Sequence, residues 1–387
     1  MMAFGLARAL VFTWSTGARP WFDPMLAIDG NSYLAGMVEI VDRTGPLDLT
    51  DIYHSPGYQI YLAGFYFLRH DAEGAIVAVK LAAWALQLLC VVLVVLVGRR
   101  SFTAPAGLGA GVLVAFSHSL ACYANLIQYE VPLAFLILAH TAGLLTFPLV
   151  PRRRLRGALF FLLGLTAAAA ALIQDRFILL VPIGAFCLWL AQRDARRLVL
   201  AYLIPAMLIL GGWAAYQTRR TGAPTLISSG AGFRFRIHNN PNAVGEAFPY
   251  VEPVEPSGWR FVISRPGRYV WLVKERFLYL WDLKKDLWYL GVPGMRGGGA
   301  SAFQVFAVCI FGAGLAMKAR SDARSGRLRE HAALYLTLFC SWIGPLLVLS
   351  SSRYNVPVIP ILALFQAEAL TRASAFCRER LKSGGLL

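Results

Sequence analysis

The side chains best placed to do chemistry are four acidic residues near the ends of long apolar segments: Asp29, Asp51, Glu130 and Asp175. The chain has only 21 acidic residues among 387, and a charge beside a membrane is costly, so those that lie there tend to be functional. A carboxylate at Asp29 could accept the proton of an attacking hydroxyl group. Asp29 is equally well placed to cap a helix that begins near Asn31. One residue can do both.

His54 and Glu130 each allow two interpretations. His54 opens the segment His54-Ser55-Pro56-Gly57-Tyr58, where its imidazole could be presented at the surface of a site. The alternative is a simple turn into the next helix, with His54 solvated. Glu130 follows Gln128-Tyr129 and begins an apolar segment. It could belong to a site, or it could only complement the N-terminal dipole of a helix.

Two arginines lie in short connections between apolar segments. Arg176 follows Gln174-Asp175, and Arg353 precedes Tyr354 after three serines. Arginine binds phosphate in a bidentate manner, so either residue could hold an anionic headgroup. Asp175 and Arg176 could instead satisfy each other as a surface pair. For Arg353 we favour phosphate binding over simple anchoring at the membrane interface.

Other motifs give little support for a cofactor. The segment Asn239-Asn240-Pro241-Asn242 has the composition of a turn, although its amides could also bind sugar hydroxyls. The sequence has no P-loop, GxGxxG, HExxH or D-x-D motif, so a nucleotide site is not supported. The six cysteines show no metal-ligand spacing. We therefore expect no cofactor; a divalent metal is possible but unsupported, and neither a zinc site nor a disulfide is supported.

The elements that position these side chains are membrane helices. Hydrophobic residues make up 57% of the chain and charged residues 15%, and the mean hydropathy is +0.56. The apolar residues form runs close to the ~20 residues that a helix needs to cross a bilayer. The sequence predicts an all-α integral membrane protein, one polytopic domain over residues 1–387, with ten membrane helices at about 3–18, 75–97, 103–121, 131–149, 157–173, 177–191, 198–216, 302–317, 332–349 and 354–372.

The basic residues predict the orientation. The net charge is +16, and many basic side chains gather in alternate short connections, including Arg99–Arg100, Arg152–Arg156 and Lys318–Arg329. Such an excess marks the cytoplasmic side. Both termini are therefore predicted to be cytoplasmic, in a protein of the bacterial inner membrane. A charge arranged in this way contacts lipid, and nucleic acid is not expected as a partner.

Two predicted external loops, 18–73 and 217–300, are too long to be simple connections. Loops beyond about 15 residues are usually functional or disordered, and both contain many aromatic and apolar residues. The first has helix candidates over 31–41 and 54–68. In the second, Pro266 opens a helix through Asp282 with a polar face of Arg268, Glu275 and Asp282. A helix of this kind suits the membrane–water interface.

Taken together, these segments resemble GT-C glycosyltransferases, in the branch that contains protein O-mannosyltransferases and the lipid A aminoarabinose transferase. Asp29 and Tyr33, followed by the segment His54 to Tyr58, are similar to the first external loop of that family. Ser352-Arg353-Tyr354-Asn355-Val356-Pro357-Val358-Ile359-Pro360 is similar to its Arg-Tyr-x-x-Pro-x-x-Pro segment. Glu130-Val131-Pro132-Leu133 is similar to its acid-x-Pro-Leu segment. Arg176 lies where many relatives have an arginine at a helix turn.

The resemblance implies transfer of a sugar from a polyprenyl-phosphate carrier to a glycan, lipid or protein acceptor on the external face, with inversion. Asp29 would be the general base, and Arg176 and Arg353 would hold the carrier phosphate. Tyr33, His54, Glu130 and Tyr354 complete the predicted substrate-binding residues. Gly30 stands where relatives of the mannosyltransferase type often have Glu, which leaves the acceptor class open. The alternatives are a transporter or flippase of a lipid-linked substrate, and a non-catalytic membrane scaffold.

Overall fold

The computed structural model describes residues 30–42, 55–150, 153–191, 199–228, 230–246, 252–283, 302–348 and 350–383. Within these ranges the protein is helical and has no strand, apart from an isolated bridge between Glu246 and Ser350. The prediction of an all-α protein is therefore confirmed.

The α-helices are α2 (Gly30–Asp42), α3 (Gly57–Arg69), α4 (Ala72–Ser101), α5 (Ala104–Ala115), α6 (His118–Ala124), α7 (Glu130–Thr146), α8 (Arg153–Ile173), α9 (Leu180–Ala191), α10 (Val199–Thr221), α11 (Gly230–His238), α12 (Trp259–Ser264), α13 (Pro266–Leu280), α14 (Ala302–Arg324), α15 (Ala332–Leu347) and α16 (Ile359–Ser383). Short 3-10 helices are η1 (Phe147–Leu149), η2 (Asp175–Leu179) and η5 (Ser352–Val358). The predicted helix over 3–18 lies outside the described residues, and each of the other nine predicted apolar helices overlaps one or more helices of the structure.

The lengths of the apolar helices show an integral membrane protein. Among the described residues, four helical stretches are long and apolar enough to cross a bilayer: Ala72–Ser101, Arg154–Ile173, Val199–Thr221 and Ser352–Leu381. The predicted helix over 103–121 is two helices, α5 and α6, bent by 49°. The hydroxyl of Ser117 accepts a hydrogen bond from the backbone N–H of Leu120 and caps α6, which is why a new helix begins there. That the chain crosses the membrane ten times remains a prediction from the sequence.

Close backbone contact joins the central helices. A Cβ atom added at Gly98 of α4 would lie 2.4 Å from Cα of Gly107 on α5, so no larger residue fits at this crossing. Gly164 of α8 is similarly tight, because a Cβ there would lie 2.0 Å from the carbonyl oxygen of Tyr202 on α10. Small residues at helix crossings are the usual way in which membrane helices gain packing contacts.

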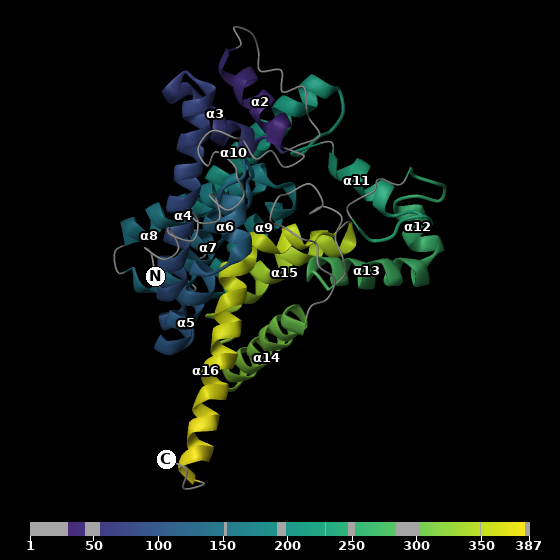
Figure 1. Ribbon diagram of the computed structural model, residues 1–387. Coiled ribbons are helices and arrows are strands. Elements are labelled where there is room, and N and C mark those ends of the chain that lie inside the picture. The colour runs from purple at the N-terminus through teal and green to yellow at the C-terminus, as the bar shows by residue number, and fades with distance from the viewer. Residues whose placement is uncertain are drawn as a thin grey trace.

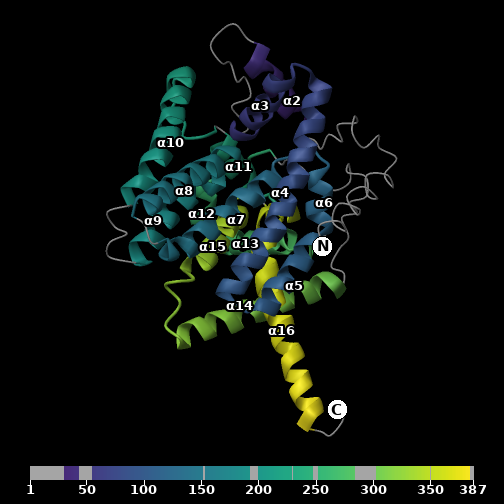
Figure 2. The same cartoon turned by 90° about the vertical axis from the view of Figure 1, so that its left-hand side faces the viewer.

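The helices place two groups of elements at opposite ends of the molecule. In both Figure 1 and Figure 2, α2 and α3 lie at the end where α4 begins, and the C-terminal half of α16 projects from the other end. Helices α11, α12 and α13 lie together at one side of the bundle (Figure 1). Helices α2 and α3 belong to the first predicted loop, and α11, α12 and α13 belong to the second.

Helix α13 has an unusual distribution of side chains for its position. Its buried face includes Glu275 and Arg276, whereas Val270 is 66% exposed and Phe277 42% exposed. Apolar side chains that face outward suit a helix lying against lipid rather than water. The buried Arg276 donates hydrogen bonds to the carbonyls of Leu346 and Leu347 at the C-terminus of α15, at 3.3 and 2.9 Å. This contact fixes α13 against the bundle.

Candidate active site

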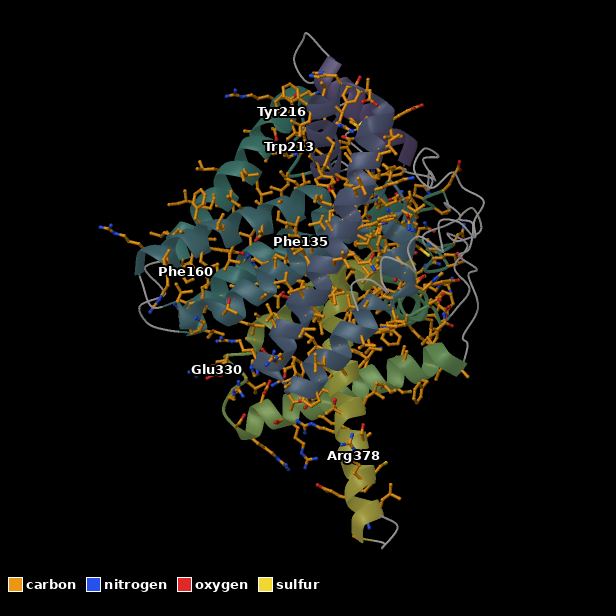
Figure 3. All side chains as sticks on the ribbon, turned by 60° about the vertical axis from the view of Figure 1, so that its left-hand side comes forward. Phe135, Phe160, Trp213, Tyr216, Glu330 and Arg378 are labelled. Carbon is orange, nitrogen blue, oxygen red and sulfur yellow. The ribbon has the colours of Figure 1, made fainter. Side chains whose placement is uncertain are left out.

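A cavity of about 300 Å³ lies between η2, the chain before α11, the C-terminal part of α15 and η5. This volume is at the lower end of the range for small-molecule sites. Its polar lining residues are Gln174, Asp175, Arg176, Ser228, Arg234 and Tyr354. The indole of Trp213 on α10 donates to the carbonyl of Ile227 at 2.9 Å and thereby fixes one wall. Figure 3 shows Trp213 and Tyr216 near the end of the molecule where α2 and α3 lie.

Arg176 lines this cavity and uses only part of its guanidinium group inside the described part of the protein. Its Nη2 donates to the carbonyl of Tyr354 at 3.0 Å, and its Cζ lies 4.7 Å from the ring centroids of both Phe177 and Tyr354. Its Nε and Nη1 are buried and have no hydrogen-bond partner among the described residues. Burial lowers the pKa of Arg176, yet a guanidinium stays charged in proteins. Arg176 therefore offers a partly buried positive charge, with two buried nitrogens that have no partner among the described residues.

Asp175 does not neutralise Arg176. Its Oδ2 accepts a hydrogen bond from the hydroxyl of Ser228 at 3.1 Å, and no ion pair joins it to Arg176 in the described part of the chain. The self-satisfied surface pair considered from the sequence is therefore absent. Arg234 of α11 adds a second guanidinium to the lining, and sequence reasoning missed it because nothing distinguishes it locally from the other basic residues of α11.

Arg353 has a different environment from Arg176. Its Nε donates to Glu130 Oε1 in a buried ion pair, and its Nη2 donates to Gln128 Oε1 at 2.5 Å. Glu130 is the first residue of α7 and is fully buried, so it has both the position expected for dipole compensation and a direct charge partner. The pair joins η5 to the start of α7. It also orients the backbone at Tyr354, which accepts from Arg176.

An aromatic cluster lies beside this ion pair. Tyr33 of α2 contacts Tyr58 of α3, with ring centroids 5.0 Å apart, and both rings lie 6.2 Å from the ring of Tyr129. The Cζ of Arg353 lies 4.9 Å from the Tyr129 centroid. Burial, together with Tyr61 and Glu130, raises the pKa of Tyr58 well above its usual value. The first predicted loop is thus packed against the residues that hold Arg353.

The asparagine segment is a turn. Asn239 and Asn240 are fully buried, and their amides donate to the carbonyls of Phe235 and Ile237 at 2.9 and 2.6 Å. The Oδ1 of Asn239 accepts from Arg276 at 3.0 Å. These groups bind within the protein, which agrees with the turn interpretation and not with sugar binding.

The structure therefore brings five predicted site residues to one region: Tyr33, Glu130, Arg176, Arg353 and Tyr354. Asp29, Asp51 and His54 lie outside the described residues. Sequence reasoning did not single out Tyr58, Gln128, Tyr129, Ser228 or Arg234, although Gln128 and Tyr129 adjoin Glu130. Among the described residues, no group of three or more His, Cys, Asp and Glu side chains is arranged to hold a metal ion.

No protein-family model and no curated protein matches the sequence. Solved structures do match the fold. ArnT from Cupriavidus metallidurans bound to undecaprenyl phosphate is 16% identical, with a TM-score of 0.56 over 96% of this chain. The Archaeoglobus fulgidus oligosaccharyltransferase tethered to an acceptor peptide is 13% identical, with a TM-score of 0.55 over 89% of this chain. This chain therefore shares its fold with both of these structures.

A further GT-C structure, archaeal AglB from Archaeoglobus fulgidus in complex with an inhibitory peptide and a dolichol-phosphate, is 11% identical with a TM-score of 0.53. The chain spans 60% of the length of ArnT and about half of the two archaeal chains, at 45% and 51%. The resemblance to GT-C glycosyltransferases that the motifs indicated is thus confirmed in the fold.

Proposed function

We propose that this protein transfers a sugar from a polyprenyl-phosphate carrier to an acceptor on the extracytoplasmic face of the membrane. The observation that carries the proposal is Arg176. A buried guanidinium normally uses its donors inside the protein, but Nε and Nη1 of Arg176 are unused among the described residues and the side chain lines a cavity. A phosphate group, which accepts two parallel N–H bonds from arginine, matches the charge of Arg176 and the number of its unused donors.

The proposed reaction is a single displacement. An acceptor hydroxyl attacks the anomeric carbon of the sugar, the bond from that carbon to the phosphate oxygen breaks, and the configuration inverts. The hydroxyl proton passes to the carboxylate of Asp29, the predicted general base. The carrier phosphate leaves with one more negative charge, which Arg176 stabilises with help from Arg234. Fixed positive groups placed where charge develops often supply a large part of catalysis.

Arg353 has a positioning role in this proposal. Its charge is already balanced by Glu130, so a second anion gains less from it than from Arg176. The pair instead holds η5, whose Tyr354 carbonyl binds Nη2 of Arg176. Tyr33 acts through the same contacts, because it packs on Tyr129 beside Arg353.

Two measurements test the proposal. Binding of undecaprenyl phosphate to the purified full-length protein, measured by native mass spectrometry, should weaken at least tenfold in Arg176→Ala. The matched control is Arg219→Ala, an exposed arginine in the last turn of α10, which should bind as the unmodified protein does. Equal binding by Arg176→Ala and the control would refute the assigned phosphate site.

The second measurement is mass spectrometry of lipid-linked sugars and glycans in cells with and without the protein. Asp29→Asn should abolish transfer, so that the sugar stays on its carrier, while undecaprenyl phosphate binding persists.

The bend between α5 and α6 is the kind of broken helix that transporters use. A flippase would move the carrier across the membrane and leave the sugar–phosphate bond intact, and the same glycan analysis separates the two functions.

A further inference from the structure

A second cavity lies at the other end of the helix bundle. It has a volume of about 410 Å³ and lies between the ends of α4, α7 and α9 and the connection from α14 to α15. Figure 3 places Glu330, one of its lining residues, at the opposite end of the molecule from Tyr216. Arg100 and the connection 318–329 belong to the side that the sequence predicts to be cytoplasmic. This cavity is separate from the proposed site of sugar transfer.

The rim of the cavity carries an excess of positive charge. Three arginines line it, Arg100, Arg327 and Arg329, against one carboxylate, Glu330. Arg327 donates to Glu330 at 3.1 Å, which balances one of the three. Neither Arg100 nor Arg329 forms an ion pair in the part of the chain that the structure describes. Two positive charges are thus left to face the same space.

The floor of the cavity contains a buried polar atom without a partner. Ser101 is 2% exposed, and its hydroxyl has no hydrogen-bond partner among the described residues. An unsatisfied buried hydroxyl is costly, and native structures contain few of them. A ligand oxygen in the cavity would satisfy Ser101.

A buried charge cluster fixes the wall next to these groups. Lys318 donates to Asp322 Oδ1 at 2.6 Å, Tyr335 donates to Asp322 Oδ2 at 2.7 Å, and His331 Nδ1 lies 2.8 Å from Oδ2. His331 Nε2, which lines the cavity side, lies 3.3 Å from Nη2 of Arg327. Because Arg327 can only donate, Nε2 accepts in that contact, while Nδ1 lies close to both Asp322 Oδ2 and the ammonium group of Lys318, which is 3.0 Å away. The cluster uses its own charges internally and positions Arg327 on the rim.

We propose that this cavity binds a phosphate-bearing anion at the predicted cytoplasmic face, with Arg100, Arg329 and Ser101 as its ligands. Arginine guanidinium groups and a hydroxyl donor are the groups that bind phosphate oxygens. The source of the phosphate is either the headgroup of an anionic lipid or a soluble phosphate compound. The wall formed by Leu144, Leu145 and Phe147 would contact the apolar part of a lipid, and basic pockets between membrane helices bind such headgroups.

The test uses the purified full-length protein in two arms. In the lipid arm, native mass spectrometry compares retention of phosphatidylglycerol with phosphatidylcholine. In the soluble arm, inorganic pyrophosphate is titrated in detergent while thermal unfolding is followed. The variant Arg100→Gln/Arg329→Gln should lower affinity for the bound anion at least tenfold, whereas Arg100→Lys/Arg329→Lys should retain most of it. If the double variant does not fold, the single variant Arg329→Gln, at an exposed position, replaces it in both arms of the test.

The matched control is Arg320→Gln/Arg324→Gln, which removes two exposed arginines of α14 that do not line the cavity. A preference for phosphatidylglycerol that only the cavity variant loses supports the site and assigns it to lipid. A stabilisation by pyrophosphate that only the cavity variant loses supports it and assigns it to a soluble compound. The proposal is overturned if neither probe binds above its background, or if the control variant loses binding to the same extent.

Discussion

Arg176 and Arg353 lie at the same end of the helix bundle but differ in what surrounds their charge. Arg353 is buried against a carboxylate and an amide oxygen, from Glu130 and Gln128. Arg176 donates to one backbone carbonyl and keeps two buried nitrogens without a partner among the described residues. A paired buried arginine holds the protein together, and an unpaired one is available to a ligand. The comparison is therefore the reason why we propose a structural role for Arg353 and a binding role for Arg176.

The largest effect that follows is on stability. Arg353→Met should lower the free energy of unfolding by about 3–5 kcal/mol, because it leaves the carboxylate of Glu130 buried without its partner. Arg176→Met is the matched comparison. It removes a charge that has little internal compensation, so the ligand-free protein should be no less stable than before. Thermal unfolding in detergent measures both.

A double variant sharpens this test. In Glu130→Gln/Arg353→Met, no uncompensated charge remains, so much of the loss caused by Arg353→Met should be recovered. If Arg353→Met and Arg176→Met destabilise the protein equally, the two arginines do not differ as described.

The positions of the helices could be predicted from the sequence, but the partners of the arginines could not. Helix positions follow from local runs of apolar residues, so α4, α8 and α10 lie where the hydropathy placed them. Glu130 and Arg353 are 223 positions apart in the chain. Their pairing depends on how α7 packs against η5, which no local pattern specifies. For this reason the sequence suggested phosphate binding for both arginines alike.

A further miss has a local cause. The prediction of one helix over 103–121 overlooked the capping signal of Ser117, which divides it into α5 and α6. The helix opened by Pro266 was expected at the membrane interface, and the outward-facing Val270 suits that placement. The burial of Glu275 and Arg276 was not expected, because the carbonyl acceptors on α15 that bind Arg276 lie far away in the sequence.

The buried arginine Arg276 extends the comparison to pH, because its charge acts on the pKa of His238. His238 is 5% exposed, and burial together with the charges of Arg276 and Arg234 lowers its pKa from 6.5 to about 3. The unfolded chain takes up a proton below pH 6.5 and the folded protein does not until about pH 3. Stability is therefore complete above pH 6.5 and should fall by about 1.4 kcal/mol per pH unit below it.

The measurement is the unfolding temperature between pH 7 and 4.5 for the unmodified protein and for His238→Asn. Any other group that titrates in this range, such as His331, contributes to both proteins, so the difference between the two slopes belongs to His238. The variant should show the shallower slope. Parallel slopes would mean that folding does not lower the pKa of His238, so that it takes up its proton over the same pH range in the folded protein and in the unfolded chain.

The smallest expected effect tests whether Arg176 can be paired with a carboxylate, as Arg353 is paired with Glu130. Ser228→Ala removes the hydrogen bond to Asp175 Oδ2 and should cost only about 1 kcal/mol of stability. It also frees the carboxylate that adjoins Arg176 in the sequence and lines the same cavity. Asp175 can then compete with phosphate for the guanidinium, so undecaprenyl phosphate binding should weaken a few-fold. Asp175→Asn in the Ser228→Ala background should restore it, because an amide carries no charge to compete. Weaker binding that persists in the double variant would show that Ser228 itself contacts the ligand.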